Sequence, residues 1–203
     1  MKLIIVKIIL LSFLCLPSVL SADLNEESNI LPENIVVEYK NEKFNLTRTG
    51  LTIRKKFFLK IYSMTHYVEK KPDSSFKEEE IYKAILHQSS TRQISMVFLR
   101  SLKAKQIQES LISGLKLNTN EREYTEMMPQ IETFMHAIYE DVEENDEFVL
   151  RWLPDGTMLS LFKGKEISSI KDENFARTLW SIWFGDYSVV DRKMLIKELL
   201  TSS

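Results

Sequence analysis

The sequence predicts an α+β fold in which helices cover one face of a long antiparallel sheet. Stretches with alternating apolar and polar residues predict the strands, and stretches with apolar residues three and four positions apart predict the helices. The elements follow one another as a β-hairpin, a long strand, helices, a β-meander and further helices. Within the meander, Pro154-Asp155-Gly156 is a strong turn signal between two neighbouring strands.

Seven segments have the composition and alternation of strands. They are Ile35–Tyr39, Glu42–Leu46, Phe57–Val68, Gln93–Arg100, Phe148–Trp152, Thr157–Phe162 and Glu166–Ile170. The first two form a hairpin that turns at Lys40-Asn41, and Gly164 serves the last turn of the meander. Because successive side chains point to opposite faces of a sheet, Tyr62 and Met64 share one face of the long strand, whereas Ile61 lies on the other.

Five segments are predicted to be helical. They are Glu78–Leu86, Ala104–Leu115, Met127–Ile138, Asp172–Trp183 and Asp191–Leu200. Three glutamates open the first helix, where the helix dipole favours negative charge. Asp172 caps the fourth helix, and Gly185 ends it.

Residues 1–22 are typical of a secretory signal peptide. Lys2 and Lys7 give a basic start, and the apolar run Ile8–Leu16 is too short to span a membrane comfortably. Small residues place the cleavage site near residue 21 or 22, and an uncleaved N-terminal anchor is the alternative. The polar residues 23–34 are predicted to be a flexible lead-in, and residues 35–203 a single domain.

Cleavage of the signal peptide would remove Cys15, the one cysteine of the chain, and with it disulfides and thiol chemistry. An exported protein that is stable without disulfides fits a bacterial periplasm, so a periplasmic or secreted location is expected. Loss of Lys2 and Lys7 changes the formal net charge from −2 to −4. Acidic and basic residues are mixed along the chain, so no nucleic-acid partner is expected. The mature chain has no other apolar run that could span a membrane, and we expect a monomer.

The common catalytic and cofactor motifs are missing from the sequence. There is no glycine-rich phosphate loop, dinucleotide fingerprint, HExxH or GxSxG. His66, His87 and His136 lack the spacing of metal ligands, and the acidic runs lack the pattern of a calcium loop. We therefore expect neither a cofactor nor a metal.

Four segments together resemble the chalcone isomerase-like family, specifically its exported bacterial branch. They are GLTIRKKFFLKIYSMTHYVE, VFLRSLKAKQIQESLISGL, LPDGTMLSLFKGKEISSI and NFARTLWSIWFGDYSVVD. The resemblance runs from about residue 35 to residue 200. The branch usually has Gly-x-Gly-x-Arg before its long strand, and here Gly50 and Arg54 are kept but Thr52 replaces the second glycine.

The resemblance implies an open-faced β-sandwich with a ligand cleft between the sheet and the helices. The family includes plant isomerases, which close a chalcone into a flavanone, and non-catalytic members that bind fatty acids and hold the carboxylate with an arginine. Arg54 matches the family arginine. The other polar positions of the isomerases fall at Tyr62 for the strand threonine, Phe98 for the lysine, Ile107 for the tyrosine, Gly114 for the asparagine and Ile182 for the late threonine.

A cleft that loses polar groups but keeps one cation should bind an apolar carboxylate such as a fatty acid. The predicted ligand-binding residues are Arg54, Tyr62, Met64, Phe98, Leu102, Ile107, Ile182 and Trp183. One alternative is an intramolecular lyase or isomerase for an enone-like substrate, with Tyr62 as the acid. The other is a structural envelope protein with a collapsed cleft, in which Arg54 pairs with an internal carboxylate.

Overall fold

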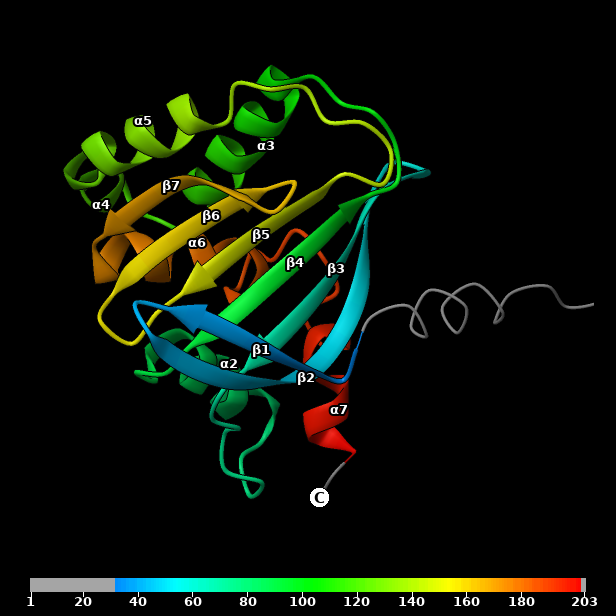
Figure 1. Cartoon of the computed structure of the whole chain (residues 1–203), viewed down its shortest axis with the longest axis vertical. Helices are drawn as coiled ribbons and strands as arrows, with labels where there is room; N and C mark the ends of the chain where they lie inside the picture. Colours follow the sequence, from blue (N-terminus) through cyan, green and yellow to red (C-terminus); the bar gives the residue numbers. More distant parts are fainter. Residues whose placement is uncertain (1–31, 202–203) are drawn as a thin grey trace, which may run out of the picture. The chain divides into compact units, whose positions relative to one another are not determined.

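The computed structural model of the protein describes residues 32–201. Within these residues seven strands form one antiparallel sheet, in the order of the chain (Figure 1). The strands are β1 (Asn34–Tyr39), β2 (Glu42–Lys56), β3 (Leu59–Val68), β4 (Arg92–Phe98), β5 (Glu147–Trp152), β6 (Thr157–Phe162) and β7 (Lys165–Lys171). The predicted α+β class and antiparallel sheet are confirmed. The predicted signal peptide at residues 1–22 lies outside the described residues.

Tight turns with left-handed backbone join several neighbouring strands. Lys40 and Asn41 have φ values of 48° and 68°, and Lys163 and Gly164 have 52° and 75°. Positive φ at both central residues is the mark of the two-residue hairpin turn whose twist matches the flanking strands, and Asn and Gly tolerate it best. The hairpin predicted at Lys40-Asn41 is thus confirmed.

The long strand predicted at Phe57–Val68 was wrong at its start. Residues 57 and 58 are instead a turn between β2 and β3, because Lys56 is paired with Leu59 across it. β2 therefore continues as far as Lys56 and is longer than the predicted Glu42–Leu46 segment. The β2–β3 hairpin extends in cyan at the upper right of Figure 1.

The start of the domain also differs from the predicted lead-in. Asn34 is already part of β1, and the backbone carbonyls of Pro32 and Glu33 accept hydrogen bonds from the Tyr67 hydroxyl and the Arg48 amide. The end of the segment 23–34 is therefore attached to the sheet.

Helices fill the connections between β3, β4 and β5 and follow the last strand. They are α2 (Glu78–His87), α3 (Ala104–Leu117), α4 (Glu121–Glu126), α5 (Met128–Ala137), α6 (Glu173–Phe184), the short 3-10 helix η1 (Met194–Ile196) and α7 (Lys197–Leu200). α4 was not predicted, and the final helix expected at Asp191–Leu200 is broken into η1 and α7. Asp172 caps α6 as predicted, since its side chain accepts a hydrogen bond from the Phe175 amide.

The main core lies between the sheet and α6. In α6, Phe175, Leu179, Trp180 and Phe184 are all fully buried. They pack in one hydrophobic cluster with residues of the sheet, α2, α3 and α5. In Figure 1 α6 lies behind the sheet, and β1 lies at its front. The face predicted to be covered by helices is therefore the face that carries the cluster.

Candidate functional site

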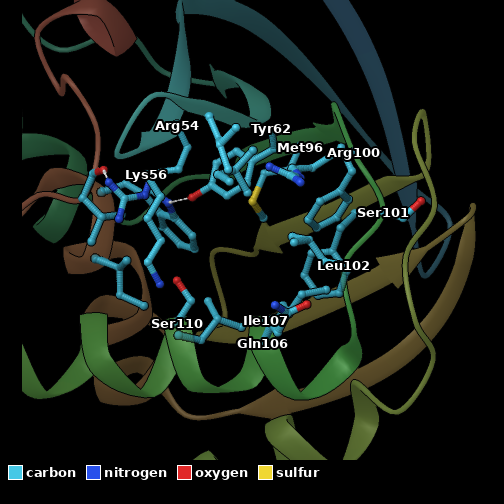
Figure 2. A pocket seen from close by; sticks show the side chains of 18 of the residues that line it. Arg54, Lys56, Tyr62, Met96, Arg100, Ser101, Leu102, Gln106, Ile107 and Ser110 are labelled. Atoms are coloured by element: carbon cyan, nitrogen blue, oxygen red, sulfur yellow. Dashed lines mark hydrogen bonds between the residues drawn. The ribbon is translucent and has the colours of Figure 1, made fainter.

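A cavity of about 360 Å³ lies between the sheet and helices α3 and α6 (Figure 2). This volume is within the range of small-molecule sites, which is about 300–1,000 Å³. The sheet contributes Arg54, Tyr62, Met96, Phe98 and Phe148, and the helices contribute Ile107, Leu111, Ile182 and Trp183. Apolar side chains therefore form most of the wall.

The register of the sheet brings the central residues of the site into one row. Arg54 on β2 is paired with Tyr62 on β3, and Tyr62 is paired with Phe98 on β4. Directly opposed residues of neighbouring strands have their side chains on the same face. The rings of Tyr62 and Phe98 meet edge to face with centroids 6.0 Å apart.

A β-bulge next to this row changes the direction of one side chain. Arg54 is paired with Tyr62 and Lys55 with Lys60, so Ile61 is an extra residue in β3. A bulge bends its strand and re-aims side chains. Ile61 consequently lines the cavity together with Tyr62, although strict alternation predicted it on the opposite face.

The helical wall depends on a close approach of α3 to α6. A Cβ atom at Gly114 would lie 2.8 Å from Cγ2 of Ile182, which is closer than real contacts allow. Glycine at this point of α3 therefore lets Ile182 sit in the cavity wall. Ile107 and Leu111 lie one turn apart on α3 and form the adjoining part of the wall.

Arg54 is bonded to backbone rather than to a carboxylate. Its Nη1 group donates to the carbonyls of Val189 and Lys55, the latter at 3.1 Å. Within residues 32–201 no aspartate or glutamate forms an ion pair with Arg54. A guanidinium group has five N–H donors, so its Nε and Nη2 donors remain for another acceptor.

Tyr62 is oriented by Trp183. The indole Nε1 donates to the Tyr62 hydroxyl oxygen at 3.1 Å. The Tyr62 hydroxyl hydrogen has no acceptor among the described residues, so it is available to a ligand. Burial raises the pKa of Tyr62 above its usual value, an effect that the Trp183 hydrogen bond and the Arg54 charge oppose. The hydroxyl is therefore protonated and able to donate at neutral pH.

Two further cations line the cavity, and both were missed by the sequence reasoning. Lys56 lies near Arg54, whereas Arg100 lies near Ser101 at the other end of the labelled residues in Figure 2. The Nε atom of Arg100 is buried without a hydrogen-bond partner in the part of the chain that the structure describes. No acidic residue is among the lining residues, so the cavity favours an anion. The sequence signal that was missed is Arg100 just beyond the predicted cavity residue Phe98.

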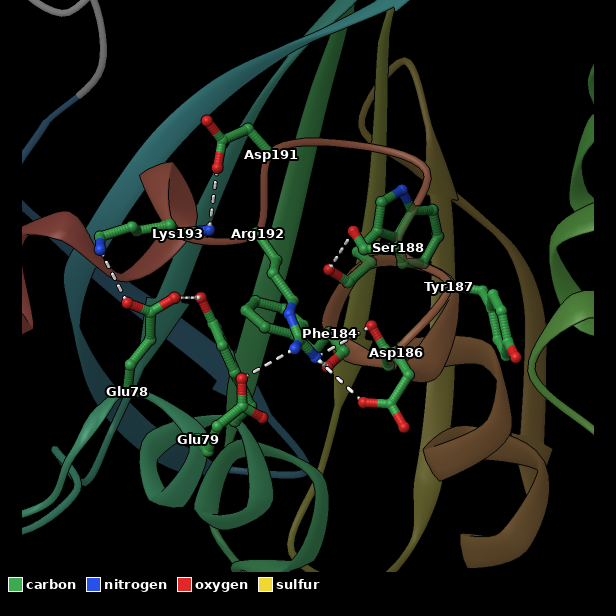
Figure 3. A network of polar contacts seen from close by, with 12 residues as sticks. Glu78, Glu79, Phe184, Asp186, Tyr187, Ser188, Asp191, Arg192 and Lys193 are labelled. Atoms are coloured by element: carbon green, nitrogen blue, oxygen red, sulfur yellow. Dashed lines mark hydrogen bonds and ion pairs between the residues drawn. The ribbon is translucent and has the colours of Figure 1, made fainter.

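The connection after α6 is held by Arg192 (Figure 3). This side chain donates to the carbonyls of Phe184 and Gly185 at 3.1 Å each and to Glu79 on α2 at 3.0 Å. A cationic side chain at the C-terminal end of a helix donates hydrogen bonds to the last carbonyls and interacts favourably with the helix dipole. The clamp fixes the chain that presents the Val189 carbonyl to Arg54.

Seven of the eight predicted ligand-binding residues come together around the cavity. They are Arg54, Tyr62, Phe98, Leu102, Ile107, Ile182 and Trp183. Met64 was expected in the wall but is fully buried in the core. It lies two residues further along β3 than Tyr62, and its partner on β4, Met96, lines the cavity instead. Whether the seven residues bind a ligand stays a prediction.

Residues 32–201 contain neither a cluster of metal-ligating side chains nor a membrane-spanning helix. These residues contain no group of three or more His, Cys, Asp or Glu side chains that could hold a metal ion. None of their helices has both the length and the apolar character needed to cross a membrane.

A curled antiparallel sheet under a helical layer, with an apolar cavity between them, defines the class of this protein as an open-faced β-sandwich. The sequence model of the family described as chalcone isomerase-like matches residues 29–201. The chain therefore belongs to the chalcone isomerase-like family, as the sequence motifs indicated.

Among solved structures, the crystal structure of an Arabidopsis thaliana fatty-acid-binding protein is similar to this chain. The TM-score is 0.63 at 15% sequence identity, and the match covers 84% of this chain and 97% of that chain. A likeness at this identity establishes the fold. Comparison with curated protein sequences gave no match.

Proposed function

We propose that this protein binds an apolar carboxylate, such as a fatty acid, without catalysing a reaction. The observation that carries the proposal is Arg54, which lines an apolar cavity and has no carboxylate partner within residues 32–201. A partly buried cation in apolar surroundings is stabilised by an anion. The alkyl chain would occupy the apolar part of the cavity, between α3 and the sheet.

The head group is assigned to the end of the cavity where Arg54 and Tyr62 lie together. The unused Nε and Nη2 donors of Arg54 suit a two-pronged hydrogen bond to a carboxylate. The Tyr62 hydroxyl supplies a third donor, because its oxygen is already engaged by Trp183. The same end of the cavity thus offers charge and directed hydrogen bonds together.

A binding role is favoured over catalysis by the residues at the other polar positions of the isomerases. Phe98, Ile107 and Ile182 occupy the positions of the lysine, the tyrosine and the late threonine, and all three line the cavity. Stabilising an enolate requires hydrogen-bond donors placed where the charge develops. These apolar side chains offer none. Our proposal also places the protein in the periplasm or outside the cell after export, on the character of residues 1–22.

The test is calorimetric titration of delipidated protein with dodecanoate and with its methyl ester. Hydrogen bonds to a charged group are worth about 1.5–3 kcal/mol, so Arg54→Ala should weaken dodecanoate binding by roughly 10- to 150-fold. The ester lacks the charge, so Arg54→Ala should change its affinity much less. The difference between the two probes separates a head-group contact from general damage to the cavity.

Two variants serve as controls for this titration. Arg122→Ala removes an exposed arginine from α4 and should leave the dodecanoate affinity unchanged. Arg100→Ala removes the cation at the other end of the cavity and should cost less than Arg54→Ala. Absence of dodecanoate binding in the wild type would sink the proposal. A larger loss in Arg100→Ala would instead reverse the assigned orientation of the ligand.

A further inference from the structure

The turn between β2 and β3 exposes a cluster of large apolar side chains. Phe57 and Phe58 are 88% and 99% exposed, and the neighbouring Leu59 is 53% exposed. We call residues 55–60 the hairpin tip, which extends in cyan at the upper right of Figure 1. Exposed apolar side chains that gather at one point indicate an interaction site, whereas scattered ones do not.

The backbone of this turn does not favour phenylalanine. Phe57 has a φ of 55°, a conformation that glycine adopts freely and a bulky side chain adopts only at a cost. The other two-residue turns of the sheet use Lys40-Asn41 and Lys163-Gly164, with the residue types that tight turns favour. Unfavourable backbone conformations of this kind concentrate at functional sites.

The charge around the tip is uniformly positive. Arg54, Lys55, Lys56 and Lys60 surround the apolar residues, and residues 54–60 include no acidic side chain. Lys55 and Lys56 are exposed. Aromatic side chains flanked by lysines fit the interface of an anionic bilayer, because the rings enter the acyl boundary while the lysines contact the head groups.

The tip is also part of the cavity entrance. Lys56, Phe57 and Leu59 line the cavity that contains Arg54 and Tyr62, whereas Phe58 does not. A surface that docks through the tip would therefore lie against the entrance. This arrangement suits an apolar ligand that resides in a membrane.

We propose that the hairpin tip docks the protein peripherally on an anionic lipid bilayer, with Phe57 and Phe58 inserted at the interface. A convex turn with two projecting rings offers little of the roughly 1,600 Å² that a stable protein–protein interface buries. Insertion into a bilayer needs only a few apolar side chains and a basic surround. Docking itself is independent of the proposed ligand. Transfer of a fatty acid between membrane and cavity would additionally depend on the proposed function.

The first test is flotation of the delipidated full-length protein with vesicles. Binding to phosphatidylcholine vesicles that contain phosphatidylglycerol should exceed binding to pure phosphatidylcholine and should fall with added salt. The double variant F57G/F58N places a favoured turn sequence at the tip, so it should keep the fold. It should lower the apparent partition coefficient by about tenfold or more, because two rings no longer insert. No binding of the wild type, or equal binding of the double variant, would overturn the proposal.

Phe76→Ser is the matched control for an exposed aromatic side chain. Phe76 is exposed and belongs to the loop between β3 and α2. This loop extends to the bottom of Figure 1, away from the tip. This variant should float as the wild type does. Any contribution of residues 1–31 to vesicle binding is common to all variants. A loss in Phe76→Ser equal to that in the double variant would contradict a specific role of the tip.

A second measurement reports insertion of the tip directly. Trp152, Trp180 and Trp183 are buried, so the substitution Phe58→Trp adds an exposed fluorophore at the tip. Its emission should shift to the blue on anionic vesicles and be quenched by lipids brominated in the acyl chain. Emission at this position that stays unshifted and unquenched on vesicle-bound protein would refute insertion.

A failure of the proposed fatty-acid binding can be distinguished from a failure of membrane docking. Phe58→Ser leaves the lining of the cavity intact, so dodecanoate should bind this variant as it binds the wild type in solution. Loss of vesicle binding with normal dodecanoate binding supports the docking site. If the wild type binds vesicles but not dodecanoate, the docking proposal stands and the fatty-acid-binding proposal is refuted.

Discussion

His66 should make the protein lose stability in mildly acidic solution. Its side chain is fully buried on β3, and its ring packs against that of Phe184 with centroids 4.5 Å apart. The Thr49 hydroxyl donates to the Leu195 carbonyl at 2.7 Å, so its oxygen accepts from the His66 Nδ1–H, also at 2.7 Å. The Nε2 atom is buried without a partner among the described residues. The native state therefore holds a neutral imidazole.

The magnitude follows from the pKa difference between the folded and unfolded chains. Burial, with a smaller contribution from the Arg92 charge, lowers the pKa of His66 to about 3 from an unfolded value near 6.5. Below about pH 6.5 the unfolded chain binds a proton that the folded chain does not bind, so stability falls as the pH falls. The slope approaches about 1.4 kcal/mol per pH unit, which gives a loss of about 2 kcal/mol between about pH 6.5 and pH 4.5. The loss continues until the pH reaches the folded pKa.

The assay is urea unfolding at a series of pH values for the wild type, His66→Asn and His87→Asn. An asparagine at position 66 removes the titration and keeps a side-chain donor for Thr49, so the slope below about pH 6.5 should largely disappear. His87 is exposed, so its replacement should leave the slope unchanged. An undiminished slope in His66→Asn would refute the assignment of this pH dependence to His66.

Two further substitutions test how the β2–β3 hairpin is built. In Gly50→Ala the new Cβ would lie 2.1 Å from the Met194 carbonyl oxygen, so β2 and η1 must separate. We expect a loss of several kcal/mol in chemical unfolding, about 3 or more, and wild-type stability would contradict this packing. Phe57→Gly should instead stabilise the fold by about 1 kcal/mol, because glycine adopts its positive φ without strain. A destabilised Phe57→Gly in the same assay would show that the phenylalanine ring supports the fold.

Local sequence signals were sufficient to predict the strands and turns of the sheet where turn composition and alternation agreed. Lys40-Asn41 marked a hairpin because asparagine tolerates left-handed backbone. The β2–β3 turn escaped detection because Phe57-Phe58 has no turn composition. A two-residue turn also preserves the period of two, so the alternation continues across the reversal. α4 escaped for a different reason, since it has no buried residue and hence no apolar periodicity, although Asn120 and Glu123 form a capping box at its start.

The alternation of residues along the strands predicted only part of the candidate site. Alternation correctly placed Tyr62 and Met64 on the same face, but it could not show that Met64 lies deeper, beneath the helical layer. It also placed Ile61 on the wrong face, because the bulge depends on the register with β2. Arg100 was placed inside the predicted strand Gln93–Arg100, but β4 ends at Phe98, so the predicted strand end was wrong. Depth, bulges and strand ends all depend on tertiary packing.

The departures from ordinary protein architecture gather at one end of the β2–β3 hairpin. Four features lie within the eight residues from Arg54 to Ile61: a bulge at Ile61, positive φ at Phe57, two exposed rings, and an arginine without a carboxylate partner within residues 32–201. Each costs stability or solubility, and nothing in the described fold requires them to occur together. At the other end of β2, in the β1–β2 hairpin, Lys40-Asn41 forms the favoured kind of turn. A cavity that holds an anionic lipid and a tip that reaches the bilayer containing it would account for all four at once. Phe58→Ser, measured with both dodecanoate and vesicles, distinguishes the cavity from the tip.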